Sequence, residues 1–201
     1  GRDRYRAFAK HHMQSGPALS PDGRFAVFFS EKDQLSFDLY LADAVSGTVI
    51  RKLATTAASA KFDSLQPLRS AGAWSADGKW FAFAAVRQGR AALQLVDMTG
   101  NGADRELVFP AIGQVLSAAW SPDGKAIAFS AINGGVTDLY TVDVATRAVQ
   151  QLTDDLFAVL QPAWSHDGRR IAFVSERFTS DERTLRIGPP RLGVIDVATK
   201  I

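Results

Sequence analysis

One unit occurs four times in this sequence, and that repeat constrains the fold more than any other feature. Its marker is Ser-Pro-Asp-Gly or a close variant, at residues 20–23, 75–78, 121–124 and 165–168. Successive markers begin 55, 46 and 44 residues apart. A period of about 40–50 residues indicates a repeat architecture, in which each unit is one supersecondary structure packed on its neighbours.

Short apolar runs surround each marker. One run follows it directly, at residues 25–28, 80–83, 126–129 and 170–173. A second run ends in aspartate, at residues 39–43, 93–97, 139–143 and 192–196, and a third follows in the first three units. Such runs of β-branched and aromatic residues between turn signals predict strands. Together with the strand that precedes the marker, these runs give each unit four predicted strands.

A single four-stranded sheet cannot cover both of its own faces, so neighbouring sheets must bury each other. We therefore predict an all-β fold: a β-propeller segment of four four-stranded antiparallel blades, as part of a larger propeller. The predicted divisions are a linker or closing strand (1–15), blade 1 (16–53), an inter-blade insert (54–71), blade 2 (72–108), blade 3 (109–153) and blade 4 (154–201).

The fourth unit is expected to stop before its outer strand. Aligning Asp143 with Asp196 places the start of that strand at Ile201. An unpaired sheet edge is a template for association with other chains. The chain alone is therefore expected to be poorly soluble or oligomeric, unless residues 5–10 close the fourth blade.

The aspartate and glycine of each marker are predicted to be structural turn residues. Glycine adopts positive φ without strain, and the aspartate carboxylate accepts backbone N–H groups. Calcium binding is the alternative role. However, each aspartate has no D-x-D-x-D loop around it, so the six to eight oxygen ligands that calcium needs are not available locally. The turn residues are Asp22, Gly23, Asp77, Gly78, Asp123, Gly124, Asp167 and Gly168.

Composition argues against several classes of function. The chain has no cysteine, three histidines, and a net charge of +2 without a run of five like charges. We therefore expect no metal site, no cofactor and no nucleic-acid partner. The longest apolar run, residues 80–86, is far below the ~20 residues of a transmembrane helix. Ser165, His166 and Asp167 are consecutive, so their side chains diverge, and no catalytic residues are predicted.

Two segments depart from the repeat and are the candidate partner-binding sites. The first is the basic N-terminus, for which a solvated linker is the alternative. The second is an insert in the fourth unit, residues 176–191, for which a plain solvated loop is the alternative. Long loops on a rigid scaffold often carry function. The candidate residues are Arg2, Arg4, Arg6, Arg177, Phe178, Arg183 and Arg186.

At its repeat markers the chain resembles the TolB-like (WD-type, PD-motif) β-propeller repeat proteins. Residues 120–129 and 164–173 nearly match the pattern W-S-P-D-G-x-x-I-A-F, and residues 38–43 and 138–143 match D-L-Y-x-x-D. Residues 38–43, 160–164 and 184–186 are similar to the propeller region of large secreted bacterial proteins that carry a peptidase-MA-like domain. The zinc-binding H-E-x-x-H helix of that domain has no counterpart here.

This resemblance implies a non-catalytic scaffold that binds other proteins in a bacterial envelope or membrane-attached assembly. It also implies a location on the periplasmic or extracellular side of that envelope. The alternative is the non-catalytic propeller of a larger secreted peptidase, which gates or presents the substrate.

Overall fold

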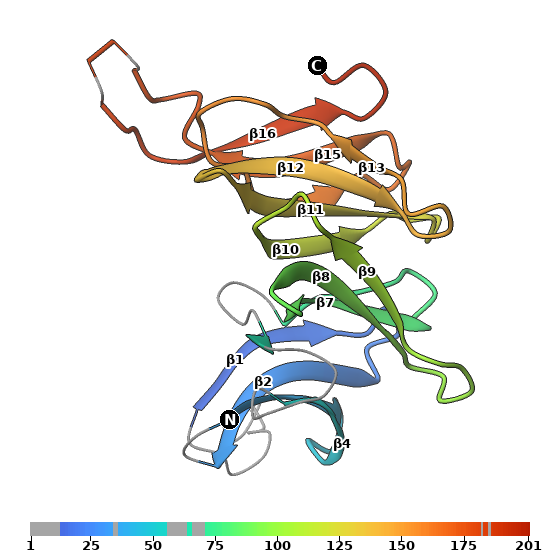
Figure 1. Cartoon of the computed structure of the whole chain (residues 1–201). Helices are drawn as coiled ribbons and strands as arrows, with labels where there is room; N and C mark the ends of the chain where they lie inside the picture. The colour runs from blue at the N-terminus through green and yellow to red at the C-terminus, as the bar shows by residue number, and fades with distance from the viewer. Residues whose placement is uncertain (1–12, 34–35, 56–63, 66–70, 182, 185) are drawn as a thin grey trace, which may run out of the picture.

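The regular secondary structure in the described part of the chain is entirely β. The computed structural model describes residues 13–33, 36–55, 64–65, 71–181, 183–184 and 186–201. These residues form sixteen strands, all paired antiparallel, and no helix (Figure 1). The predicted fold class is confirmed.

The strands form four sheets in chain order. The first contains β1 (Met13–Leu19), β2 (Phe25–Asp33), β3 (Ser36–Asp43) and β4 (Val49–Ala54). The second contains β5 (Ser64–Leu65), β6 (Ala73–Trp74), β7 (Trp80–Arg87), β8 (Arg90–Asp97) and β9 (Arg105–Phe109). The third contains β10 (Gln114–Trp120), β11 (Ala126–Asn133), β12 (Val136–Asp143) and β13 (Val149–Gln151). The fourth contains β14 (Leu160–Trp164), β15 (Arg170–Ser175) and β16 (Arg191–Asp196).

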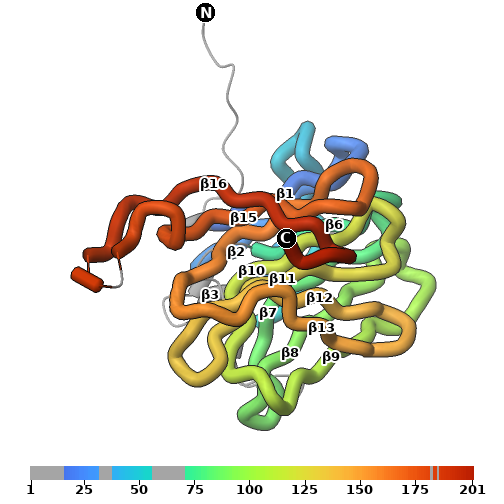
Figure 2. Tube along the Cα trace, turned by 90° about the horizontal axis from the view of Figure 1, so that it is seen from above, coloured from blue at the N-terminus to red at the C-terminus, as the bar shows by residue number. Residues whose placement is uncertain are grey.

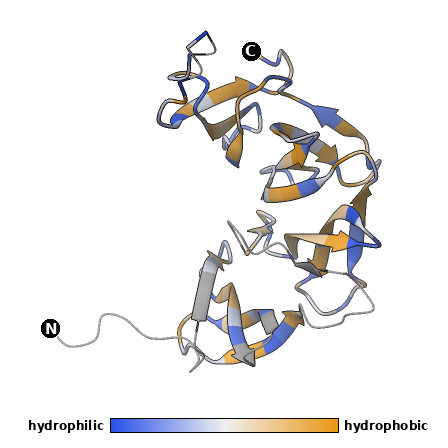
Figure 3. Ribbon diagram, turned by 60° about the vertical axis from the view of Figure 1, so that its left-hand side comes forward, coloured by the Kyte–Doolittle hydropathy of each residue, from blue (hydrophilic) through white to orange (hydrophobic). Residues whose placement is uncertain are grey.

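The core lies between successive sheets, which follow an arc with the first and fourth sheets at its ends (Figure 3). Phe81 and Phe83 of the second sheet pack on the first sheet. Phe129 of the third sheet packs on the second, and Phe173 of the fourth packs on the third. Successive side chains of a strand point to opposite faces of its sheet. Because each inner sheet has a neighbouring sheet on either side, apolar side chains on both of its faces are buried.

Tryptophan side chains link the innermost strands. Trp74 Nε1 donates to the carbonyl of Ala18 at 3.1 Å, and Trp164 Nε1 donates to the carbonyl of Ala119 at 3.1 Å. Each bond joins one sheet to the sheet before it. Trp74 and Trp164 therefore join consecutive sheets as well as filling the core, whereas Trp120 is buried without such a hydrogen bond.

In the second sheet the innermost position is divided between two short strands. Leu65 of β5 pairs with Ala85, whereas Ala73 of β6 pairs with Ala82. The innermost strands of the other sheets each have one β-bulge at this point. Seven residues, 66–72, separate β5 from β6 in the chain. Part of the segment predicted as an insert, residues 54–71, therefore interrupts a strand.

The antiparallel order places two kinds of connection at opposite ends of the sheets. The marker turns, such as residues 20–25 and 121–126, lie at one end. The hairpins 87–90 and 133–136 lie at the other, with the connections between sheets. The fourth-sheet insert joins β15 to β16 and thus lies at this second end, where it projects from the body (Figure 2).

Candidate functional site

The four marker turns have the same geometry. In each, the serine Oγ donates to the aspartate carboxylate at 2.6 Å and accepts a backbone N–H at 2.9 Å. The glycine adopts φ near +70°, for example at Gly124. The serine hydroxyl and one aspartate oxygen of each turn are engaged within it, so this end of the sheets has the features of a structural element.

The turn carboxylates remain ionised to low pH. A hydrogen bond from Ser121 is the main cause that lowers the pKa of Asp123. Such a carboxylate stabilises the fold above its unfolded pKa, and this contribution is lost as pH falls through the folded value. The same direction applies at Asp22, Asp77 and Asp167.

The N-terminal candidates Arg2, Arg4 and Arg6 lie outside the described residues, as does the candidate closing strand at residues 5–10. The fourth-sheet candidates are described, and their loop has internal structure. Asp181 and Arg186 exchange two backbone hydrogen bonds, of 2.9 and 3.1 Å. Thr179 Oγ1 donates to the carbonyl of Pro189 at 2.6 Å, which closes the base of the loop.

Two contacts tie this loop to the connection that enters the fourth sheet. Glu176 Oε1 accepts the N–H of Ala158 at 2.9 Å. Arg177 Nη1 lies 3.0 Å from the carboxylate of Asp155, and its guanidinium lies over the ring of Phe173. Arg177 is therefore already used inside the fold. Its role as a partner-binding residue stays a prediction.

A pocket of about 330 Å³ lies between the loop and this connection. Two of its apolar side chains face solvent, Leu156 with 75% and Ile187 with 87% of its surface exposed. Its other lining residues are Phe157, Glu176, Ser180, Asp181 and Arg186. Phe178 is half exposed on the same loop, and Arg183 is exposed beside it. Large apolar side chains exposed around a pocket are typical of interaction surfaces.

Asp138 anchors the connection beside this pocket, a role that the sequence analysis did not assign. Its carboxylate is 5% exposed and accepts hydrogen bonds from Thr153 Oγ1 at 2.9 Å and from Gln151 Nε2 at 3.2 Å. Asp38 is the equivalent residue of the first sheet, where Lys52 Nζ lies 2.8 Å from it. The signal was present in the sequence, because an aspartate inside an otherwise apolar strand recurs in both copies of the D-L-Y pattern.

The two aspartates have opposite pKa directions. Burial raises the pKa of Asp138, and the nearby charge of Asp154 adds to the rise. Burial is also the largest influence on Asp38 and opposes its ionisation, but hydrogen bonds from Lys52, Thr55 and Tyr40 and the charge of Lys52 together outweigh burial, so the pKa is lowered. Lys52 pairs with Tyr40, and Gln151 pairs with Tyr140, so the two residues hold the same register position. One difference between the sites is the charge of Asp154 near Asp138, and a second is the residue at this position, an ammonium in one site and an amide in the other.

This difference predicts the effect of Gln151→Lys. In the native chain, a raised pKa at Asp138 means that stability falls as pH rises from about 3.9, the unfolded value, through the folded value. Lysine at residue 151 should remove this fall and stabilise the fold at neutral pH by about 1 kcal/mol, since the ammonium is partly exposed. Urea unfolding at about pH 4 and about pH 7 measures it. A variant with the native pH dependence would contradict the assignment.

Two other classes of site were sought among the described residues. No group of three or more histidine, aspartate or glutamate side chains is placed there to hold a metal ion. Within the same residues, no helix has the length and apolarity to cross a membrane.

Comparison with known proteins agrees with the geometry. The TolB beta propeller domain model (PD40) matches residues 61–181, more than half of the chain. No curated protein matches closely enough to count as a relative. TolB from Agrobacterium tumefaciens is similar with a TM-score of 0.72 at 21% identity, over 94% of this chain and 64% of that one.

Two further structures show the same fold. TolB from Acinetobacter baumannii gives a TM-score of 0.68 at 23% identity, over 94% of this chain and 42% of that one. A prolyl endopeptidase gives 0.61 at 16% identity, over 92% of this chain and 27% of that one. The chain thus spans less than two thirds of the length of these proteins. On the match of the family model and the four repeated sheets, the chain belongs to the TolB beta-propeller domain family.

Proposed function

We propose that this chain is a non-catalytic β-propeller scaffold that binds other proteins in an assembly of the bacterial envelope. The contact surface is the fourth-sheet loop and its pocket, where Phe178, Arg183 and Arg186 contact the partner. Arg177 holds the loop in place. The periplasmic side of the envelope is the location that membership of this family favours.

The observation that carries the proposal is the exposure of apolar side chains on a hydrogen-bonded loop and on the connection beside it. Leu156, Phe178 and Ile187 have 75%, 55% and 87% of their surfaces exposed. The loop around them is bonded across residues 181 and 186, so little ordering is needed when a partner docks. Arginine and aromatic side chains at such a surface are the residue types that dominate binding energy at interfaces.

The test is a double substitution, Arg183→Ala with Arg186→Ala. Both side chains are exposed, so we expect the melting temperature to change little, since isolated surface charges contribute about 0–1 kcal/mol. Pull-down from the native envelope should lose the partner. A double mutant that melts early yet retains its partners would make the loop structural. Arg177→Ala is the contrasting variant, because it breaks the contact with Asp155 and should lower the melting temperature.

The second candidate is the propeller of a larger secreted peptidase that gates or presents the substrate. The fold likeness to a prolyl endopeptidase, with a TM-score of 0.61, favours it. The full reading frame separates the two proposals. A hydrolase domain or an H-E-x-x-H helix encoded next to these repeats would favour the peptidase.

A further inference from the structure

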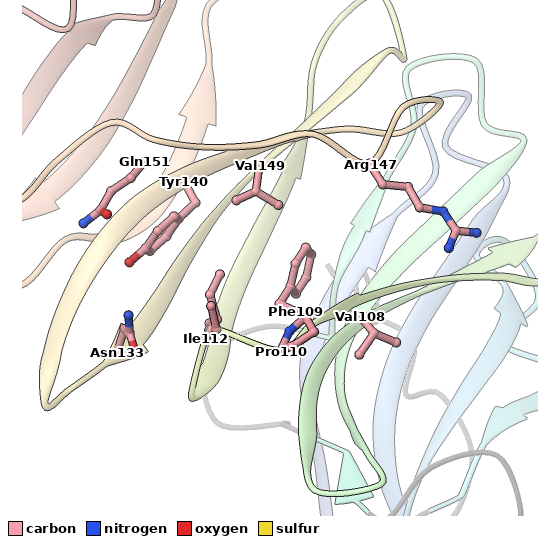
Figure 4. A pocket seen from close by; sticks show the side chains of 10 residues that line it. Val108, Phe109, Pro110, Ile112, Asn133, Tyr140, Arg147, Val149 and Gln151 are labelled. Carbon is pink, nitrogen blue, oxygen red and sulfur yellow. The ribbon is translucent and has the colours of Figure 1, made fainter.

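A second surface lies between the outer strands of the second and third sheets, away from the fourth-sheet loop. It is a groove of about 400 Å³ (Figure 4). Residues 108–112, at and after the end of β9, form one wall. The third sheet supplies the other wall, with Asn133, Tyr140, Arg147, Val149 and Gln151.

The floor of the groove is apolar and fixed by the core. Phe109, Ile112 and Tyr140 belong to the hydrophobic cluster that joins the two sheets, and each is at most 8% exposed. Val149 is 46% exposed at the mouth. A ligand that binds in the groove therefore contacts a preformed apolar surface, which lowers the entropic cost of binding.

Arg147 is the one charged side chain among the described residues that line the groove. No ion pair within the described part of the chain involves it. Its backbone φ is +64°, a left-handed conformation that is strained for a residue with a side chain. The equivalent turn of the first sheet has Gly47 at φ +72°. The equivalent turn of the fourth sheet has Lys200 at φ +59°, so the third and fourth sheets both have a cationic side chain where glycine would be less strained.

The open edge of β13 runs beside the same groove. Thr141 pairs with Gln150, and the Asp143 N–H donates to the carbonyl of Ala148. Because ladder bonds alternate along an antiparallel pair, the backbone N–H and C=O of Val149 and Gln151 point away from β12. The Gln151 carbonyl accepts from Lys200 Nζ at 3.0 Å. The Val149 backbone remains on the edge, in position to pair with an extended chain.

We propose that this groove binds an extended peptide segment of a protein partner. An apolar side chain of the peptide packs between Val108 and Val149, and an aspartate or glutamate beside it pairs with Arg147. The apolar floor selects the apolar side chain of the peptide. The Arg147 guanidinium selects the acidic side chain, because arginine binds carboxylates through two parallel hydrogen bonds. The site is separate from the fourth-sheet loop and extends the scaffold function to short linear segments.

The test uses a displayed library of random hexapeptides as the probe. Enriched peptides are expected to combine Leu, Ile, Val or Phe with Asp or Glu within two positions. Arg147→Gly should bind them roughly tenfold more weakly and lose the preference for acids. This variant should fold well, because it restores the residue type of the first-sheet turn. Val149→Asp should abolish binding, because it places a negative charge in the groove where the acidic side chain of the peptide would lie.

Arg90→Gln is the matched control, because Arg90 is an exposed arginine outside the groove, and it should bind as the native chain does. The Arg183→Ala and Arg186→Ala variant should also bind normally, which separates this site from the proposed docking loop. The inference is overturned by a library without enriched peptides. It is equally overturned by peptides that bind native protein and the Arg147→Gly and Val149→Asp variants alike.

Discussion

Replacing Phe129 with alanine is expected to lower the free energy of unfolding by about 3–5 kcal/mol, because a fully buried ring leaves a cavity that its neighbours cannot fill. Phe129 is 0% exposed. Its ring stacks on Phe109 with centroids 4.8 Å apart and on Tyr140 with centroids 5.4 Å apart. The substitution therefore removes the centre of the cluster that holds the second sheet on the third.

Thermal melting and urea unfolding measure this loss. For a chain of this length, the expected decrease in melting temperature is roughly 6–20 °C. Phe178→Ala is the control, since its ring is 55% exposed and its removal should cost at most about 1 kcal/mol. Equal destabilisation by the two variants would contradict the placement of Phe129 at the sheet interface. Hydrogen exchange should show the lost protection first in the second and third sheets, because Phe129 belongs to the cluster that joins these two sheets.

The sequence predicted the features that repeat. Four copies of the marker turn specify four sheets, and the alternating run after each marker specifies the strand on which the neighbouring sheet packs. Phe81, Phe129 and Phe173 lie in such runs and are all buried. These elements are predictable because local residue patterns determine them and because each copy supports the assignment of the others.

The divided inner strand of the second sheet could not be predicted. Residues 66–72 interrupt the period, and β5 is only two residues long, too short for an alternating pattern. Its pairing with Ala85 and Val86 arises because β7 extends beyond the two residues that β6 covers. Tertiary pairing, rather than local propensity, makes Ser64 and Leu65 a strand.

The candidate sites depend on contacts between segments that do not recur in the four repeats. Arg177 and Asp155 are far apart in the chain and lie in connections that differ from those of the other units. The inter-sheet groove depends on how two outer strands diverge, which sequence periodicity does not describe. Only the arginine at residue 147, where the first unit has Gly47, marks the groove in the sequence.

Gly72→Ala is expected to cost about 2–6 kcal/mol, from backbone strain of about 1–3 kcal/mol and a steric clash of about 1–3 kcal/mol. Gly72 has φ +134°, which side chains of L-residues rarely adopt. A Cβ there would overlap the carbonyl oxygen of Ala82 and lie 2.7 Å from the Phe81 ring. Phe81 is fully buried and cannot move aside without disturbing the first sheet.

Gly124→Ala separates the two causes, because Gly124 has φ +70° and open space where the methyl group of alanine would lie. Strain alone should cost about 1–2 kcal/mol there. Urea unfolding of both variants gives the comparison, and the difference between them is the steric contribution at Gly72 together with the greater backbone strain of its φ of +134°. Gly72 is the last residue between β5 and β6, so its conformation sets how the chain enters β6 at the innermost position of the second sheet. Equal losses in the two variants would show that the approach to Ala82 and Phe81 carries no energetic weight.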